Sequence, residues 1–178
     1  HPTQALLDLY TIQENKGKIK DLKVLIIGDI SHSRVARSNI MGLIELGAEV
    51  RVVGPSTLIP KELSKLGVKI YTDINQALQG VDVINILRIQ LERQSEGLFP
   101  SIAEYRHFYG IDENRLNNLS DDILVMHPGP MNRGIEIDSA VADGAQSVIT
   151  EQVTNGVAIR MALLYLLAGG GNANEDLT

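Results

Sequence analysis

The stretch Val83-Ile84-Asn85-Ile86-Leu87 runs directly into Arg88-Ile89-Gln90-Leu91-Glu92-Arg93. Its first five residues have the apolar, β-branched character of a buried strand, and such a strand ordinarily ends in turn residues such as Gly, Asn or Asp. This one ends instead in two guanidinium groups, an amide and a carboxylate. Because arginine can hold a carboxylate or phosphate with two parallel hydrogen bonds, the stretch predicts a strand whose carboxyl end binds a small anion.

Four further apolar runs resemble this strand, and helical patterns separate most of them. The predicted strands are 24–27, 50–53, 68–71, 83–87 and 123–126, and the predicted helices are 34–46, 60–66, 74–78, a segment around 102–108, and 155–167. Strands that alternate with helices indicate right-handed βαβ units and a parallel sheet. We therefore expect an α/β fold, a Rossmann-like doubly wound five-stranded parallel sheet with helices on both faces and strand order 3-2-1-4-5.

Polar residues gather after three of these strands. They occupy 28–34 after the first strand, 88–90 after the fourth and 127–133 after the fifth. In an open parallel sheet, ligands bind beyond the carboxyl ends of the strands where the strand order reverses. In the expected order this point lies between the first and fourth strands, so we expect the three clusters to converge on one crevice.

Composition narrows the class of protein. The chain has 178 residues, a formal net charge of −6 and no cysteine. The negative charge disfavours a general affinity for nucleic acid or an anionic membrane, and the absence of cysteine excludes disulfides and cysteine-based zinc sites. Neither a secretory signal nor an apolar span of about 20 residues is present, so we expect a cytoplasmic protein.

A dinucleotide-binding domain is the obvious competing interpretation. Its first turn should read G-x-G-x-x-G and its second strand should end in an acidic residue. The first turn here is Gly28-Asp29-Ile30-Ser31 and the second strand ends in Val53-Gly54-Pro55, so both marks are missing. The chain also lacks a Walker phosphate loop and a G-x-S-x-G elbow, and its four histidines show no metal-ligand spacing.

Five motifs in order resemble the carbamoyltransferase family, most closely the C-terminal, aspartate-binding domain of its aspartate branch. They are His1-Pro2-Thr3-Gln4, Gly28-Asp29-x-x-x-Ser33-Arg34-Val35-Ala36-Arg37-Ser38, Leu87-Arg88-Ile89-Gln90-x-Glu92-Arg93, Met126-His127-Pro128-Gly129-Pro130-x-Asn132-Arg133-Gly134 and Asn155-Gly156-Val157-x-x-Arg160-Met161. The ornithine branch has a His-Cys-Leu-Pro motif, whereas this chain has no cysteine. Two positions depart from the family. Ser31 stands where many members have Lys, and Gly129 stands where Leu or Ala is frequent, which would loosen the placement of its carbonyl.

The resemblance implies that a carbamoyl group is transferred from carbamoyl phosphate to L-aspartate. It assigns aspartate binding to residues that follow two of the predicted strands. Arg34 would bind the α-carboxylate, and Arg88 with Gln90 would bind the β-carboxylate. These last two alternate along an extended segment and so face the same side. Glu92 and Arg93 would orient Arg88 and lock a closed state.

The resemblance also assigns the carbamoyl side of the site. His1 would donate to the carbamoyl oxygen, and Gln4, one helical turn later, would accept from the carbamoyl NH₂. The turn Pro128-Gly129-Pro130 would direct carbonyl groups at the reacting amine. His127 is expected to be structural, as are Arg37, Arg133 and Arg160. Neither a cofactor nor a metal ion is implied.

The family also has a carbamoyl-phosphate domain with a Ser-Thr-Arg-Thr loop, which is not in these 178 residues. We therefore expect 1–178 to be the aspartate/ornithine carbamoyltransferase Asp-binding domain, with 1–16 as an inter-domain helix, 169–178 as a C-terminal tail and the N-terminal domain absent. Alone, the chain would be inactive. The partners implied for the full-length enzyme are L-aspartate, carbamoyl phosphate, two further copies in a homotrimer and a possible regulatory chain, with no nucleic acid and no membrane.

Two other interpretations stay open on the sequence. The chain is alternatively a non-catalytic module of the same fold that binds dicarboxylates or serves assembly, because Arg34, Arg88 and Gln90 are present while the phosphate loop is not. It is alternatively part of a carbamoyltransferase that uses another amine.

Overall fold

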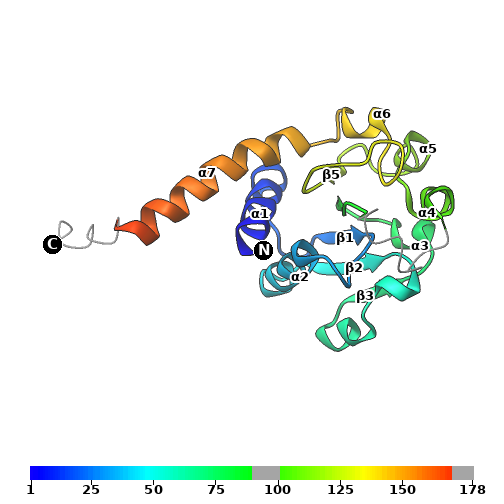
Figure 1. Cartoon of the computed structure of the whole chain (residues 1–178), viewed down its shortest axis with the longest axis horizontal. Helices are drawn as coiled ribbons and strands as arrows, with labels where there is room; N and C mark the ends of the chain where they lie inside the picture. Colours follow the sequence, from blue (N-terminus) through cyan, green and yellow to red (C-terminus); the bar gives the residue numbers. More distant parts are fainter. Residues whose placement is uncertain (90–100, 170–178) are drawn as a thin grey trace.

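A five-stranded, all-parallel sheet forms the centre of the computed structural model, which describes residues 1–89 and 101–169 (Figure 1). Its strands are β1 Lys23–Ile27, β2 Glu49–Val53, β3 Lys69–Tyr71, β4 Val83–Ile86 and β5 Leu124–Met126. Their order is β3-β2-β1-β4-β5, and each neighbouring pair is parallel. The predicted strands, order and switch point between β1 and β4 are therefore confirmed.

The helical segments follow the predicted pattern, apart from the short turn η1 and the differences given below. They are α1 Pro2–Lys16, α2 Arg34–Glu45, α3 Ile74–Ala77, α4 Ile102–Tyr109, α5 Glu113–Leu116, α6 Ser139–Ala142 and α7 Ile149–Ala168, with 3₁₀ turns η1 Ser56–Leu58 and η2 Lys61–Leu66. The segment predicted as a helix at 60–66 is a 3₁₀ helix. The single-turn helices α5 and α6 were not predicted, and α7 begins six residues before the predicted 155. Its first turns carry polar residues such as Gln152, which is nevertheless 3% exposed, so the apolar pattern did not reveal them.

Both faces of the sheet are covered, because alternate residues of each strand point to opposite sides. On β1, Val24 and Ile26 pack in the same apolar cluster as residues of α1 and α2. Leu25 and Ile27 belong to a second cluster that includes residues of α3, α5 and α6. The doubly wound arrangement predicted from the sequence is therefore confirmed.

The last helix is buried in its first half only. Ile149, Gln152 and Gly156 are buried, and α7 packs against α1. Beyond Gly156 the helix extends away from the sheet, and its apolar side is open, with Val157 58% and Leu167 83% exposed (Figure 1). Among the described residues, no helix combines the length and apolar character needed to cross a membrane.

Two glycines let the turns after β1 and β2 meet at the carboxyl edge of the sheet. A Cβ atom on Gly54 would lie 2.4 Å from the carbonyl oxygen of Gly28, far inside van der Waals contact. Gly28 itself has φ +124°, which side chains rarely allow. Glycine at both positions therefore allows the two turns to approach closely, beside the polar residues 28–34.

Candidate active site

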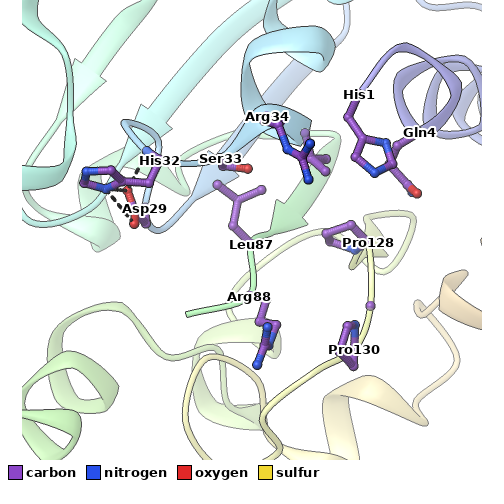
Figure 2. Close-up of a pocket in the computed structure, with 12 residues that line it drawn as sticks. His1, Gln4, Asp29, His32, Ser33, Arg34, Leu87, Arg88, Pro128 and Pro130 are labelled. Carbon is purple, nitrogen blue, oxygen red and sulfur yellow. Dashed lines mark hydrogen bonds and ion pairs between the residues drawn. The ribbon is translucent and has the colours of Figure 1, made fainter. Parts of the chain in front are cut away.

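A pocket of about 190 Å³ lies at the carboxyl edge of the sheet, beside the switch point (Figure 2). Four segments supply its walls: the start of α1, the turn between β1 and α2, the residues after β4 and the turn after β5. The lining residues are His1, Gln4, Asp29, His32, Ser33, Arg34, Val35, Leu87, Arg88, Pro128, Gly129 and Pro130. The volume is below the range typical of pockets for drug-sized ligands, so the pocket suits a small metabolite.

Six of the nine residues predicted for the site line this pocket: His1, Gln4, Arg34, Arg88, Gly129 and Pro130. The other three, Gln90, Glu92 and Arg93, lie outside the described residues. The convergence of the three polar clusters is therefore seen in the structure. The roles of the individual side chains stay predictions.

Arg34 enters the pocket from the amino end of α2. The preceding residue, Ser33, caps this helix by accepting a hydrogen bond from the backbone N–H of Ala36 at 3.0 Å. The first turn of α2 contains no acidic residue, so the positive end of the helix dipole and the guanidinium of Arg34 act in the same direction. This wall of the pocket therefore favours an anion.

Arg88 approaches from the opposite side, where Figure 2 places it near Pro130. The residues on either side, Leu87 and Ile89, are each 1% exposed, and the backbone N–H of Leu87 donates to the Ile27 carbonyl at 2.9 Å. Buried neighbours thus hold the segment that carries Arg88. The pocket thus has arginines on two opposite walls, and two guanidinium groups can bind a ligand that has two anionic groups.

The turn after β5 is held by a buried histidine. The backbone N–H of Gly129 donates to His127 Nδ1 at 2.9 Å, so the imidazole hydrogen resides on Nε2, which lies 3.2 Å from Glu136 Oε1. Gly129 has φ +65°, a conformation that Leu or Ala would adopt only with strain. The N–H of Gly129 is held by His127, and the looser placement expected for the Gly129 carbonyl stays a prediction. The expected structural role of His127 fits this arrangement.

Gln4 is oriented by a buried carboxylate that the sequence did not reveal. Asp8 is 1% exposed and accepts hydrogen bonds from Gln4 Nε2 at 3.0 Å, Gln152 Nε2 at 2.8 Å and Asn39 Nδ2 at 2.7 Å. Burial raises the pKa of Asp8, and these hydrogen bonds oppose the rise. Since the amide nitrogen of Gln4 faces Asp8, its Oε1 is left as the acceptor. This oxygen accepts a long hydrogen bond, of 3.5 Å, from a guanidinium nitrogen of Arg160.

An aspartate–histidine pair also lines the pocket and was not among the predicted site residues. His32 Nδ1 lies 3.0 Å from both carboxylate oxygens of Asp29, and the backbone N–H of His32 donates to one of them. The signal available in the sequence was an acid directly after a strand with a histidine three residues later. Among the described residues that line the pocket, the side chains of two arginines and one carboxylate carry charge, in a chain of net charge −6.

Among the residues that the structure describes, no three His, Asp or Glu side chains are grouped so as to hold a metal ion. The described residues that line the pocket offer guanidinium, imidazole, carboxylate and amide side chains together with the backbone of the turn after β5. Of these, the guanidinium and amide groups can bind anions and stabilise charge that develops on oxygen during a reaction.

Comparison with known proteins identifies the family. The family model described as "Aspartate/ornithine carbamoyltransferase, Asp/Orn binding domain" matches residues 20–167. The aspartate carbamoyltransferase catalytic subunit of Halothermothrix orenii is 74% identical over 177 residues, which are 99% of this chain and 56% of that protein. The corresponding subunit of Moorella thermoacetica is 67% identical over 97% of this chain and 56% of that protein. The chain therefore spans about half the length of the curated relatives it matches.

Solved structures agree with this assignment. Ornithine carbamoyltransferase from Pyrococcus furiosus superimposes with a TM-score of 0.80 at 29% identity, covering 93% of this chain and 56% of that one. Aspartate transcarbamoylase from Trypanosoma cruzi, in complex with carbamoyl phosphate and aspartate, gives a TM-score of 0.76 at 26% identity, covering 93% of this chain and 54% of that one. Residues 20–167 form the aspartate/ornithine-binding domain. Fold, motifs and overall similarity agree, and the chain belongs to the aspartate/ornithine carbamoyltransferase family.

Proposed function

We propose that this chain is the aspartate-binding half of an aspartate carbamoyltransferase. The amine of L-aspartate attacks the carbamoyl carbon of carbamoyl phosphate, the bond from that carbon to the phosphate oxygen breaks, and the amine loses a proton. The products are N-carbamoyl-L-aspartate and phosphate, as in de novo pyrimidine biosynthesis. The relatives named above as aspartate carbamoyltransferase catalytic subunits support aspartate as the amine.

The observation that carries the proposal is the placement of Arg34 and Arg88 on opposite walls of one small pocket, with the Gly129 turn beside them. L-Aspartate has two carboxylates with an amine between them. In the proposed complex, Arg34 binds the α-carboxylate and Arg88, with Gln90, binds the β-carboxylate. The carbonyls of Gly129 and Pro130 then accept hydrogen bonds from the amine, which positions its nitrogen for attack.

The carbamoyl group lies at the α1 side of the pocket in this proposal. His1 donates to the carbamoyl oxygen, where negative charge develops in the transition state. Gln4 accepts from the carbamoyl NH₂ through Oε1, the atom left available by its bond to Asp8. Glu92 and Arg93 orient Arg88 in the closed state.

The carbamoyl-phosphate half of the enzyme is proposed to lie in sequence outside these 178 residues. In this arrangement residues 1–16 connect the two halves and 169–178 form a tail. Two observations support this arrangement: the apolar side of α7 is exposed, and the chain covers 56% of the Halothermothrix orenii subunit. The complete enzyme would be a cytoplasmic homotrimer, with or without a regulatory chain, and this chain alone would not turn over.

A hybrid enzyme tests the proposal. Residues 1–178 would replace the matching 177 residues of the Halothermothrix orenii catalytic subunit, to which they are 74% identical. We expect the hybrid to carbamoylate aspartate in preference to ornithine, and the isolated chain to show no turnover. A hybrid that folds but accepts only ornithine, or an isolated chain with full activity, would contradict the proposal.

Two arginines of the same helix provide a matched comparison in this hybrid. Arg34→Ala removes a charged hydrogen bond to the substrate and should lower kcat/KM for aspartate by about 10- to 100-fold. Arg37→Ala, one turn along α2 and outside the pocket, should leave it within about twofold. Equal losses in both variants would show that charge on the helix, rather than the Arg34 contact, is what matters. Titration of the isolated chain with succinate would separate weak dicarboxylate binding from catalysis.

A further inference from the structure

Behind the pocket, Glu136 accepts three hydrogen bonds while its side chain is fully buried. Its Oε1 accepts from the backbone N–H of Asn132 at 2.6 Å and lies 3.2 Å from His127 Nε2, and its Oε2 accepts from Asn132 Nδ2 at 3.2 Å. Asn132 Nδ2 also donates to the carbonyl of Ile89 at 3.0 Å. One buried carboxylate is therefore connected to two separate segments of the chain.

These two segments supply two of the four walls of the pocket. One connection runs from Glu136 through His127 to the N–H of Gly129, in the turn after β5. The other runs from Glu136 through Asn132 to the carbonyl of Ile89, the residue that follows Arg88. The side chain of Asn132 links these two walls directly, because it belongs to the loop after β5 and donates to the backbone after β4.

A contribution to folding alone does not explain this arrangement. Burying a carboxylate is costly, and a well-packed apolar side chain at its position is often neutral or more stable. What an apolar residue would not supply is the direction of Asn132, whose amide must point one hydrogen to Glu136 and one to Ile89. A carboxylate fixes this orientation because it accepts and never donates when ionised.

We propose that Asn132, held by Glu136, is a positioning residue that sets the distance between Arg88 and the Gly129 turn. This inference rests on the proposed function, and it adds a residue that acts on aspartate without touching it. Asn132 fixes the backbone at Ile89 and thereby the starting point of the Arg88 side chain. Among residues 1–89 and 101–169, neither His1 nor Gln4 on the α1 wall forms a direct hydrogen bond with Asn132, and Gln4 is linked to it only indirectly, by way of Asp8 and Gln152.

The test uses Asn132→Ala in the hybrid enzyme, with KM for both substrates measured separately. We expect KM for aspartate to rise on the order of tenfold, because Arg88 is displaced from its working geometry. KM for carbamoyl phosphate should stay within about twofold, because the α1 wall is untouched. A merely structural residue would lower the melting temperature without separating the two constants.

Asn118→Ala is the matched control, since Asn118 is exposed and its amide also donates to a backbone carbonyl, that of Asn114 at 2.7 Å. It should leave both constants unchanged. The inference would be overturned if Asn132→Ala left KM for aspartate unaltered, or if KM changed equally for both substrates. In that case the activity of the unmodified hybrid would still support the proposed function.

A second measurement needs no variant and covers the case in which Asn132→Ala does not fold. Nitrogen chemical shifts of the imidazole of His127, from NMR on the ¹⁵N-labelled chain at neutral pH, report which ring nitrogen carries the hydrogen. We expect the hydrogen on Nε2, facing Glu136. A hydrogen on Nδ1 would mean that Gly129 cannot donate there, and the anchoring scheme would be wrong.

Discussion

Two buried carboxylates, Asp8 and Glu136, flank the pocket and are used in different ways. Each is at most 1% exposed and accepts three hydrogen bonds. The donors to Asp8 are amide side chains from α1, α2 and α7, so this carboxylate joins three helices. The donors to Glu136 come from His127 and Asn132, less than ten residues away, so this one shapes a loop. The same chemical group thus secures helix packing on one side of the site and loop geometry on the other.

Gln152 is where the two clusters meet. Its Nε2 donates to Asp8 at 2.8 Å and its Oε1 accepts from the backbone N–H of His127 at 3.0 Å. The comparison therefore predicts that a substitution of Gln152 affects both sides of the pocket. A substitution of a residue that belongs to only one cluster should affect only the side on which that cluster lies.

The largest effect is expected for Gln152→Leu. The substitution leaves a buried N–H without an acceptor and removes a donor from a buried carboxylate, so the unfolding free energy should fall by about 3 kcal/mol. Urea unfolding of the chain measures this. Gln13→Leu is the control, because Gln13 is exposed on α1 and should change stability by less than about 0.5 kcal/mol. Similar losses in the two variants would mean that Gln152 does not join the clusters.

Asn39→Ala should come next. Asn39 donates to Asp8 from α2, and its loss should cost about 2 kcal/mol of stability because a buried acceptor loses a partner. In the hybrid enzyme, this variant should leave KM for aspartate within about twofold, unlike Asn132→Ala. A selective rise in that constant for Asn39→Ala would break the distinction between a packing carboxylate and a positioning one.

A smaller effect concerns pH. Burial raises the pKa of Asp8 in the folded chain, so the protonated form is favoured by folding. The stabilisation that the Asp8 carboxyl group contributes is fully present below its pKa in the unfolded chain, and it is lost as pH rises through its pKa in the folded chain. Asp8→Asn removes that loss, so the stability of the variant relative to the parent should increase from acidic to neutral pH. A constant difference in urea midpoints across this range would contradict the direction of the shift.

The smallest effect is expected for Arg133→Ala. Arg133 directly follows Asn132 and forms a two-pronged pair with Asp143, at 2.6 and 2.8 Å, on the exposed surface. Exposed pairs contribute little because solvent screens them. We expect no measurable change in melting temperature or in KM for aspartate. A change as large as that of Asn132→Ala would show that the whole loop, rather than the Asn132 side chain, determines the position of Arg88.

The sheet was predictable because its signals are local. Each strand is a run of apolar residues, and each predicted boundary lies within one residue of the observed one. The two carboxylate clusters were not predictable for the opposite reason. Asp8 lies in a helix where an acid ordinarily faces solvent, and its partner Gln152 is 144 residues away. The same distance hid the start of α7, since Gln152 in its first turn is buried against Asp8 and the backbone of His127.

The sequence by itself determined the parallel sheet, its strand order, the edge at which ligands bind and the family. Hydrophobic periodicity and short motifs are properties of neighbouring residues, and strand order follows from a few general rules of connection. Tertiary structure alone decided which polar residues are buried, which ring nitrogen of His127 carries its hydrogen and how Asn132 connects the walls of the pocket. Those properties depend on partners brought together from distant parts of the chain, because a buried polar group is defined by what it bonds to and not by its neighbours in sequence.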